Sequence, residues 1–317
     1  MIDYNVFRHF AQWGGDGANY YTAPSNRLSR LITTVISKGS ILDFTPPSAN
    51  SSYSVEFYGP SVSCGPAISF NNSQTADLIQ EFSRTLGGTI IKYVGFVPSQ
   101  NVINETHLDA ALAGLNNTLQ DNQYVETFDR ISEDHARLYV AVPRLDSGSS
   151  LTFDGSADTT IECGLYNTSF QVDFISNDGS QDTNIRNVTR LNGVTSALAI
   201  TNYCDMPGGP GQLCSATETA YIALLDALGS QLVGQIKQSH YGPIGAVRTQ
   251  ILNSVFMDSR ELHKMQEQVD KWLTSSTEAA AAPDVEPLSI ANMNIADALE
   301  QVFINCTLSL FSESYFI

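Results

Sequence analysis

The feature that most constrains the fold is a β-hairpin signal in the middle of the chain. Residues 169–176 alternate between apolar and polar side chains, so the apolar ones share one face of a strand. Asn-Asp-Gly follows at 177–179 and favours a hairpin turn. A returning strand is expected at about 182–190. The pattern predicts a β-hairpin.

The remaining periodicity predicts an α+β fold, with a β-rich N-terminal two thirds containing interspersed helices and a helical C-terminal third. Three regions are expected: an N-terminal loop and helix at 1–39, a β-rich α+β domain at 40–205, and a mainly helical region at 206–317 with a flexible excursion at 275–287. Further strands are predicted at 53–58, 90–97 and 138–142. Helices are predicted at about 28–38, 74–86, 106–119, 215–232, 243–258 and 260–273, and from Asn294 onward.

Charge and composition exclude one class of function and favour one environment. The chain of 317 residues has 16 Lys and Arg against 33 Asp and Glu, a formal net charge of −17. This balance excludes a nucleic-acid binder held by a basic surface. Charged residues make up only 15% of the chain, and Ser, Thr and Asn replace them. A surface of hydroxyl and amide groups is typical of an extracellular or lumenal protein.

Seven Asn-x-Ser/Thr sequons are candidate N-glycosylation sites, where about four are expected by chance in a chain so rich in Asn, Ser and Thr. Their placement in predicted turns and at the ends of elements suits a surface glycan. The alternative is that the composition alone produces the sequons. The candidate acceptors are Asn50, Asn71, Asn104, Asn116, Asn167, Asn187 and Asn305.

Five cysteines lack the spacing of a zinc site, so we expect no structural metal. Cys204 and Cys214 bracket a segment rich in Pro and Gly, and a disulfide closing this loop would restrict the unfolded chain. Cys64 and Cys163 would then form the second pair and leave Cys306 single. The alternative is five reduced thiols in a cytosolic protein.

No motif predicts a catalytic residue, a cofactor or a metal ligand. The string at 59–63 lacks the second glycine of a nucleophile elbow. Glu133-Asp134-His135 is the densest acid and imidazole cluster, but it directly precedes a predicted strand and is interpreted as an exposed turn. The acidic segment at 154–158 lacks the glycine and the terminal acid of a calcium loop. The sequence favours a protein that is not an enzyme.

Neither the beginning of the chain nor any other window predicts insertion into a membrane. Residues 1–10 lack the apolar stretch of a secretory signal peptide. No window has the run of about 18 apolar residues that a transmembrane helix needs. We expect membrane tethering only through segments absent from this chain. The alternative is a soluble cytosolic protein whose sequons are fortuitous.

Three stretches of the chain form a recognisable set. They are Ser52-Tyr-Ser-Val-Glu-Phe-Tyr-Gly-Pro-Ser-Val-Ser-Cys64 with the segment from residue 40 ahead of it, Cys163-Gly-Leu-Tyr-Asn-Thr-Ser-Phe-Gln-Val-Asp-Phe174, and Leu299-Glu-Gln-Val-Phe-Ile-Asn-Cys-Thr-Leu-Ser-Leu310. Together they resemble a family of uncharacterised filamentous-fungal membrane proteins. They occur in the expected order and span most of the chain.

The resemblance implies a large glycosylated extracytoplasmic region between transmembrane segments, with no established activity. It implies a Cys64–Cys163 bridge and glycans at Asn167 and Asn305. The chain departs from the family in lacking the flanking hydrophobic helices and in having Cys306 where an aliphatic residue is expected.

The lead hypothesis is the ectodomain of a fungal membrane or surface protein with a non-catalytic binding or structural role. Such an ectodomain would lie on the extracytoplasmic side of the plasma membrane or in an endomembrane lumen. The alternative is a secreted hydrolase with a non-contiguous active site.

Overall fold

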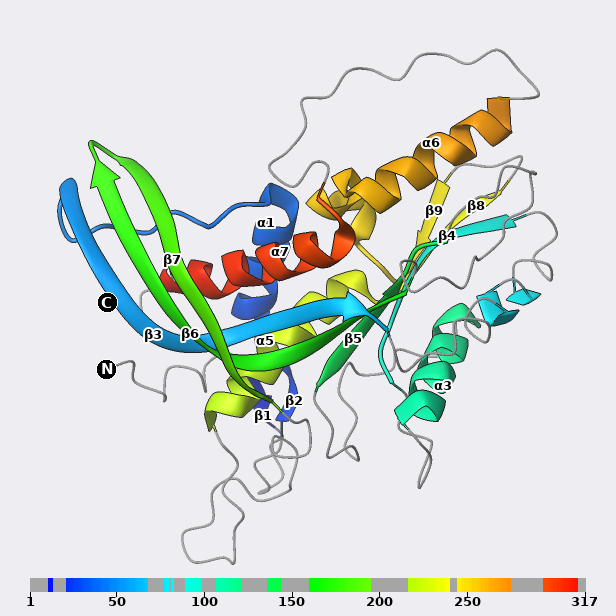
Figure 1. Cartoon of the computed structure of the whole chain (residues 1–317), viewed down its shortest axis with the longest axis horizontal. Helices are drawn as coiled ribbons and strands as arrows, with labels where there is room; N and C mark the ends of the chain where they lie inside the picture. The colour runs from blue at the N-terminus through cyan, green and yellow to red at the C-terminus, as the bar shows by residue number, and fades with distance from the viewer. Residues whose placement is uncertain are drawn as a thin grey trace, which may run out of the picture.

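The computed structural model of the chain has a mixed α+β fold in which helices pack on one antiparallel sheet (Figure 1). The fold class predicted from the sequence is confirmed. The structure describes residues 11–13, 21–67, 77–79, 81–82, 89–98, 107–120, 136–143, 160–194, 216–239, 244–274 and 293–312.

The sheet contains seven strands in the order β3-β6-β5-β4-β8-β9, with β7 also paired to β6. These strands are β3 (Asn50–Pro66), β4 (Thr89–Phe96), β5 (Arg137–Ala141), β6 (Thr160–Asn177), β7 (Ser180–Gly193), β8 (Gly234–Ser239) and β9 (Ile244–Val247). β5 and β7 follow one another along one side of β6, and β3 occupies the other side over its whole length. β3 is therefore an edge strand. β1 (Ala11–Trp13) and β2 (Tyr21–Pro24) form a separate pair.

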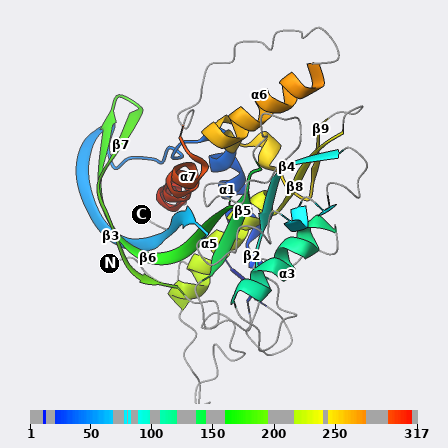
Figure 2. The same ribbon diagram turned by 45° about the vertical axis from the view of Figure 1, so that its right-hand side comes forward.

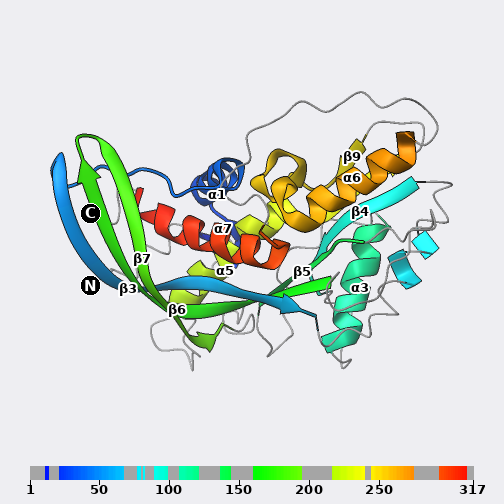
Figure 3. The ribbon, with the colours of Figure 1, turned by 45° about the horizontal axis from the view of Figure 1, so that its top comes forward.

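The β6–β7 hairpin is the one that the sequence predicts. Asp178 and Gly179 have φ of 48° and 89°, the two positive values that a type I′ turn requires. Pairing continues from Asn177 opposite Ser180 to Tyr166 opposite Gly193, with two irregularities along the way. Both strands are thus longer than predicted. Together with β3 they form a curled three-stranded ribbon that projects from the rest of the sheet (Figures 1 and 3).

β3 does not end at Gly59-Pro60, where the sequence predicts its end, but continues to Pro66. Proline normally interrupts a sheet because it lacks an N–H donor. Pro60 lies opposite Asn167 on an edge strand, and its nitrogen points away from β6. The missing donor therefore costs no hydrogen bond to β6, and the strand passes through the proline.

Helices cover both faces of the sheet at its β4 end (Figure 2). One face carries α3 (His107–Leu119), and the other carries α5 (Ala216–Leu232) and α6 (Arg260–Thr274). α1 (Asn26–Lys38) contacts α5 and α7 (Ile295–Ser309), and α7 lies against β3 inside the curl of the ribbon. Short 3-10 helices are η2 (Ile251–Asn253), η3 (Val255–Asp258) and η4 (Leu310–Ser312).

The helix ends follow the capping signals in the sequence. Ser25 accepts a hydrogen bond from the backbone of Leu28 at the start of α1, and Gly39 ends that helix with φ of 72°. Asn294 and Asp297 exchange two hydrogen bonds of 2.7 Å at the start of α7. The predicted start of the last helix at Asn294 is therefore confirmed. Within the predicted helix at 74–86, residues 77–79 and 81–82 are helical.

One prediction about the C-terminal third is wrong. The helix expected at 243–258 is instead the edge strand β9 followed by two 3-10 helices, because Ile244–Val247 pair with β8. β8 lies beyond the region boundary expected near residue 205 and pairs with β4 in the same sheet. One hydrophobic core contains residues from both sides of that boundary.

Candidate functional site

The curled ribbon is the most distinctive surface of the molecule. We define the ribbon as residues 50–58 of β3, 169–177 of β6 and 180–189 of β7. Its inner face carries an aromatic cluster, in which Phe57 stacks on Phe170 with ring centroids 5.1 Å apart. Phe311 meets Phe57 edge to face at 4.9 Å. Burial of this cluster against α7 sets which face of the ribbon points inward.

The outer face of the ribbon is polar and exposed. Along β3 the exposed residues are the even-numbered ones from Ser52 to Tyr58. One row of side chains crosses all three strands: Arg186 of β7 contacts Asp173 of β6 and Ser54 of β3. Ser54 also donates to Asp173. That hydrogen bond, with help from Arg186, lowers the pKa of Asp173 below its ordinary value.

A disulfide anchors the ribbon to the rest of the sheet. Cys64 and Cys163 are directly opposed on β3 and β6, with Cα atoms 4.0 Å apart. The bond joins residues separated by 99 positions, so the chain-entropy model gives an upper value of about 4.7 kcal/mol for its stabilisation, and typical values are about 2–4 kcal/mol. The pairing implied by the sequence resemblance is present in the structure.

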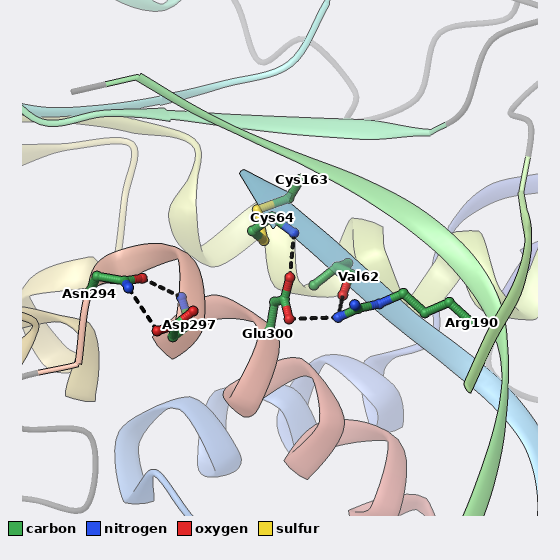
Figure 4. Close-up of a disulfide and its surroundings, with 7 residues drawn as sticks. All are labelled: Val62, Cys64, Cys163, Arg190, Asn294, Asp297 and Glu300. Carbon is green, nitrogen blue, oxygen red and sulfur yellow. Dashed lines mark hydrogen bonds and ion pairs between the residues drawn. A yellow bond between two sulfur atoms is a disulfide. The ribbon is translucent and has the colours of Figure 1, made fainter. Parts of the chain in front are cut away.

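Glu300 of α7 connects the anchor to the ribbon (Figure 4). One of its carboxylate oxygens accepts from the backbone N–H of Cys64 at 2.6 Å, and the other accepts from Arg190 at 2.6 Å. Arg190 also donates to the carbonyl of Val62 at 2.9 Å. Glu300 of α7 and Arg190 of β7 thereby satisfy backbone groups of β3 that face away from β6.

α7 approaches β3 closely at one glycine. Thr307 donates to the carbonyl of Pro60 at 2.8 Å. A Cβ atom on Gly59 would lie 3.0 Å from the Thr307 side chain, so this position favours glycine. The β3 edge is therefore covered by α7 from Pro60 to Cys64.

The structure separates the candidate glycosylation sites by exposure. Asn50 and Asn187 are exposed, whereas Asn116 and Asn167 are half-buried. Asn167 accepts a hydrogen bond from the hydroxyl of Tyr221 at 3.4 Å. Asn71 and Asn104 lie outside the described residues.

Asn305, in contrast to Asn50 and Asn187, is buried in this fold. Its side chain is 5% exposed. Its amide nitrogen, the atom that a glycan would occupy, donates to the carbonyl of Gly39 at 3.0 Å. Its oxygen accepts from Gln301 of the same helix at 3.0 Å. Both polar groups of Asn305 thus have partners, and the bond to Gly39 connects α7 to the end of α1.

Of the three remaining cysteines, the structure describes Cys306. Cys306 is a free thiol, and its complete burial raises its pKa well above the ordinary value, so it is unreactive at neutral pH. Cys204 and Cys214 lie outside the described residues, as does the Glu133-Asp134-His135 cluster.

Sequence reasoning missed one buried cation, Lys92. It is 2% exposed in the middle of β4 and donates to Gln266 at 2.8 Å and to Gln238 at 3.2 Å. Burial lowers the pKa of Lys92 to about 8, although Asp270 acts in the opposite direction. The signal was a single lysine within the apolar string Thr-Ile-Ile-Lys-Tyr-Val-Gly-Phe. Because two amide oxygens bind the amine, we interpret Lys92 as structural.

Among the described residues, no three His, Cys, Asp or Glu side chains gather where they could hold a metal ion. No helix in the described part of the chain has the length and apolar character needed to span a membrane. No family model, curated protein or solved structure matches the chain.

Proposed function

We propose that this chain is the extracytoplasmic region of a filamentous-fungal membrane or surface protein, with a binding or structural role rather than a catalytic one. The observation that carries the proposal is the Cys64–Cys163 disulfide, because such bonds persist in oxidising compartments. It joins β3 to β6, two of the three strands that form the ribbon.

The ribbon supports a binding role. Its outer face presents hydroxyl, amide and carboxylate groups on a rigid sheet. The row formed by Ser54, Asp173 and Arg186 is held in place by hydrogen bonds within the row. Preorganised polar groups lose little conformational entropy when a partner binds.

Among the residues that the structure describes, no contact favours the hydrolase alternative. The Nε2 atom of His263 lies 3.3 Å from the carboxylate of Glu267, and both side chains are exposed on the surface of α6. Within the described contacts, no serine or cysteine joins this pair to form a catalytic triad.

The proposal is tested on protein purified from its native host. Gels are run with and without an N-glycosidase, and with and without reductant. We expect faster migration after deglycosylation and slower migration after reduction, because the disulfide keeps the denatured chain compact. Unchanged mobility under both treatments would overturn the proposal.

Single sequon variants make the glycan test specific. Asn187→Gln removes an exposed acceptor and is expected to remove one glycan step from the untreated protein. Asn305→Gln is the matched control. It removes a buried acceptor, so the number of glycan steps should stay the same.

A further inference from the structure

The side of β3 that faces away from β6 can be identified from the partners of its backbone groups. The Cys64 N–H and the carbonyls of Pro60 and Val62 all bond to residues outside β6. The Cα separation of 4.0 Å between Cys64 and Cys163 is also that of a non-hydrogen-bonded pair. Even-numbered residues of β3 therefore direct their N–H and C=O groups away from β6.

The register between β3 and β6 has no irregularity from Asn50 to Pro66. The same alternation therefore holds along the ribbon, where Ser52, Ser54, Glu56 and Tyr58 direct their backbone groups outward. Among the described residues, none bonds to these groups. β3 is also the outermost strand in three views of the molecule (Figures 1, 2 and 3).

Native proteins usually protect such an edge with lysine, proline or a bulge. The free segment from residue 52 to residue 58 contains none of these, and its one charged residue is Glu56. Protection begins only at Pro60, where α7 covers the strand. An edge of this kind is suited to pairing with another strand.

We propose that the occupant of this edge is a second copy of the chain, paired antiparallel through residues 52–58 about a two-fold axis at Val55. The free edge extends from Ser52 to Tyr58, between the hydrogen-bonded carbonyls of Asn50 and Pro60, and Val55 is its midpoint. Two identical edges therefore overlap most fully when Val55 faces itself. Both ribbons then curve toward the same face, and their sheets join into one.

The side chains in this register are complementary. Ser54 lies opposite Glu56 of the second copy, and Ser52 lies opposite Tyr58. Arg186 reaches Ser54 across β6, so it meets the Glu56 carboxylate of the second copy at the end of the same row. A shift of the register by two residues in one direction would instead place Glu56 opposite Glu56. Charge therefore favours the register centred on Val55.

The first test is molecular mass against concentration, measured by sedimentation on the full chain between about 1 μM and 1 mM, which brackets weak association. We expect the mass to rise from 34.4 kDa toward twice that value. Glu56→Lys should weaken the dimer at least about tenfold, because it opposes Arg186 of the second copy. Asp182→Lys is the matched control on β7 and should leave the dimer unchanged.

The second test is covalent. Val55→Cys places two thiols across the axis at a non-hydrogen-bonded pair, where Cα atoms lie about 4.5 Å apart and a disulfide can form. We expect a dimer linked by a disulfide under mild oxidation. Tyr53→Cys on the same strand and face would lie opposite Phe57 of the second copy, so it should not cross-link to itself.

Amide exchange distinguishes self-pairing from other occupants. In the dimer, the amides of residues 52, 54, 56 and 58 should exchange slowly, and Glu56→Lys should make them fast. The amides of residues 53, 55 and 57 should stay slow in both proteins, because they bond to β6. A monomeric mass with fast exchange would overturn the proposal. A monomeric mass with slow exchange would also overturn it, since another segment would then cover the edge.

Discussion

The two ends of the sheet are built in different ways. At the β4 end, both faces are buried, and seven of the eight residues of β4 are inaccessible to solvent. At the ribbon end, one face packs on α7 and the other is open. One sheet thus combines a part that is stabilised by packing on both faces with a part that is held by a few local contacts, chiefly the Cys64–Cys163 disulfide and Glu300. We call these contacts the anchors, and we call the contrast between the two ends the division. The predictions below test it.

The largest effect is expected at the β4 end. Phe96 is fully buried and stacks on Tyr139 with centroids 5.2 Å apart, so Phe96→Ala should lower the free energy of unfolding by about 4 kcal/mol. Tyr53→Ala removes a half-buried ring at the ribbon end and should cost only about 1–2 kcal/mol. Denaturant unfolding measures both. Equal losses would contradict the division.

Removal of the anchor should have the next largest effect. The double variant Cys64→Ser with Cys163→Ser should lower the free energy of unfolding by about 3 kcal/mol, because the unfolded chain is no longer constrained. Wild-type protein in reductant serves as the control and should unfold at the same denaturant concentration as the variant. An unchanged midpoint would show that the ribbon does not need its disulfide.

Lys92 predicts a pH effect at the β4 end. Its pKa is about 8 in the folded protein, below the value of an exposed lysine. The unfolded chain therefore binds more protons between about pH 8 and 10.5, and stability should rise with pH through that window by up to about 3 kcal/mol. Lys92→Met should remove this rise. An equal rise in both proteins would assign the effect to other groups.

The smallest effect is expected on the outer face of the ribbon. The lowered pKa of Asp173 means that its stabilising contribution is present above the unfolded pKa and is lost as pH falls through the folded one. Asp173→Asn should lower the melting temperature at pH 7 by no more than about 2 °C, since the pair is exposed. At pH 3 the two proteins should melt closer together. A larger decrease in melting temperature would show that Asp173 stabilises the ribbon as the disulfide and Glu300 do.

What could be predicted from the sequence was local. The Asn-Asp-Gly turn, the Gly39 helix end and the Asn294 cap each depend on a few adjacent residues, and each is present. The Glu300 contact with Cys64 joins residues 236 positions apart. No local pattern in the sequence indicates such a contact.

At two places tertiary contacts outweigh a local sequence signal. The apolar spacing at 243–258 is compatible with a helix, but pairing with β8 turns its first part into a strand. The Asn305 sequon satisfies the local rule for glycosylation, yet the packing of α7 buries it. Tertiary contacts override the local signal in both cases.

The most direct test of the division is native-state amide exchange, followed residue by residue in oxidised and reduced protein. On reduction, we predict faster exchange along β6 and β7 from residue 166 to residue 190, with β4 unchanged. This result would show that the disulfide holds the ribbon while packing holds the β4 end. An equal increase at both ends, or no change at either, would contradict the account.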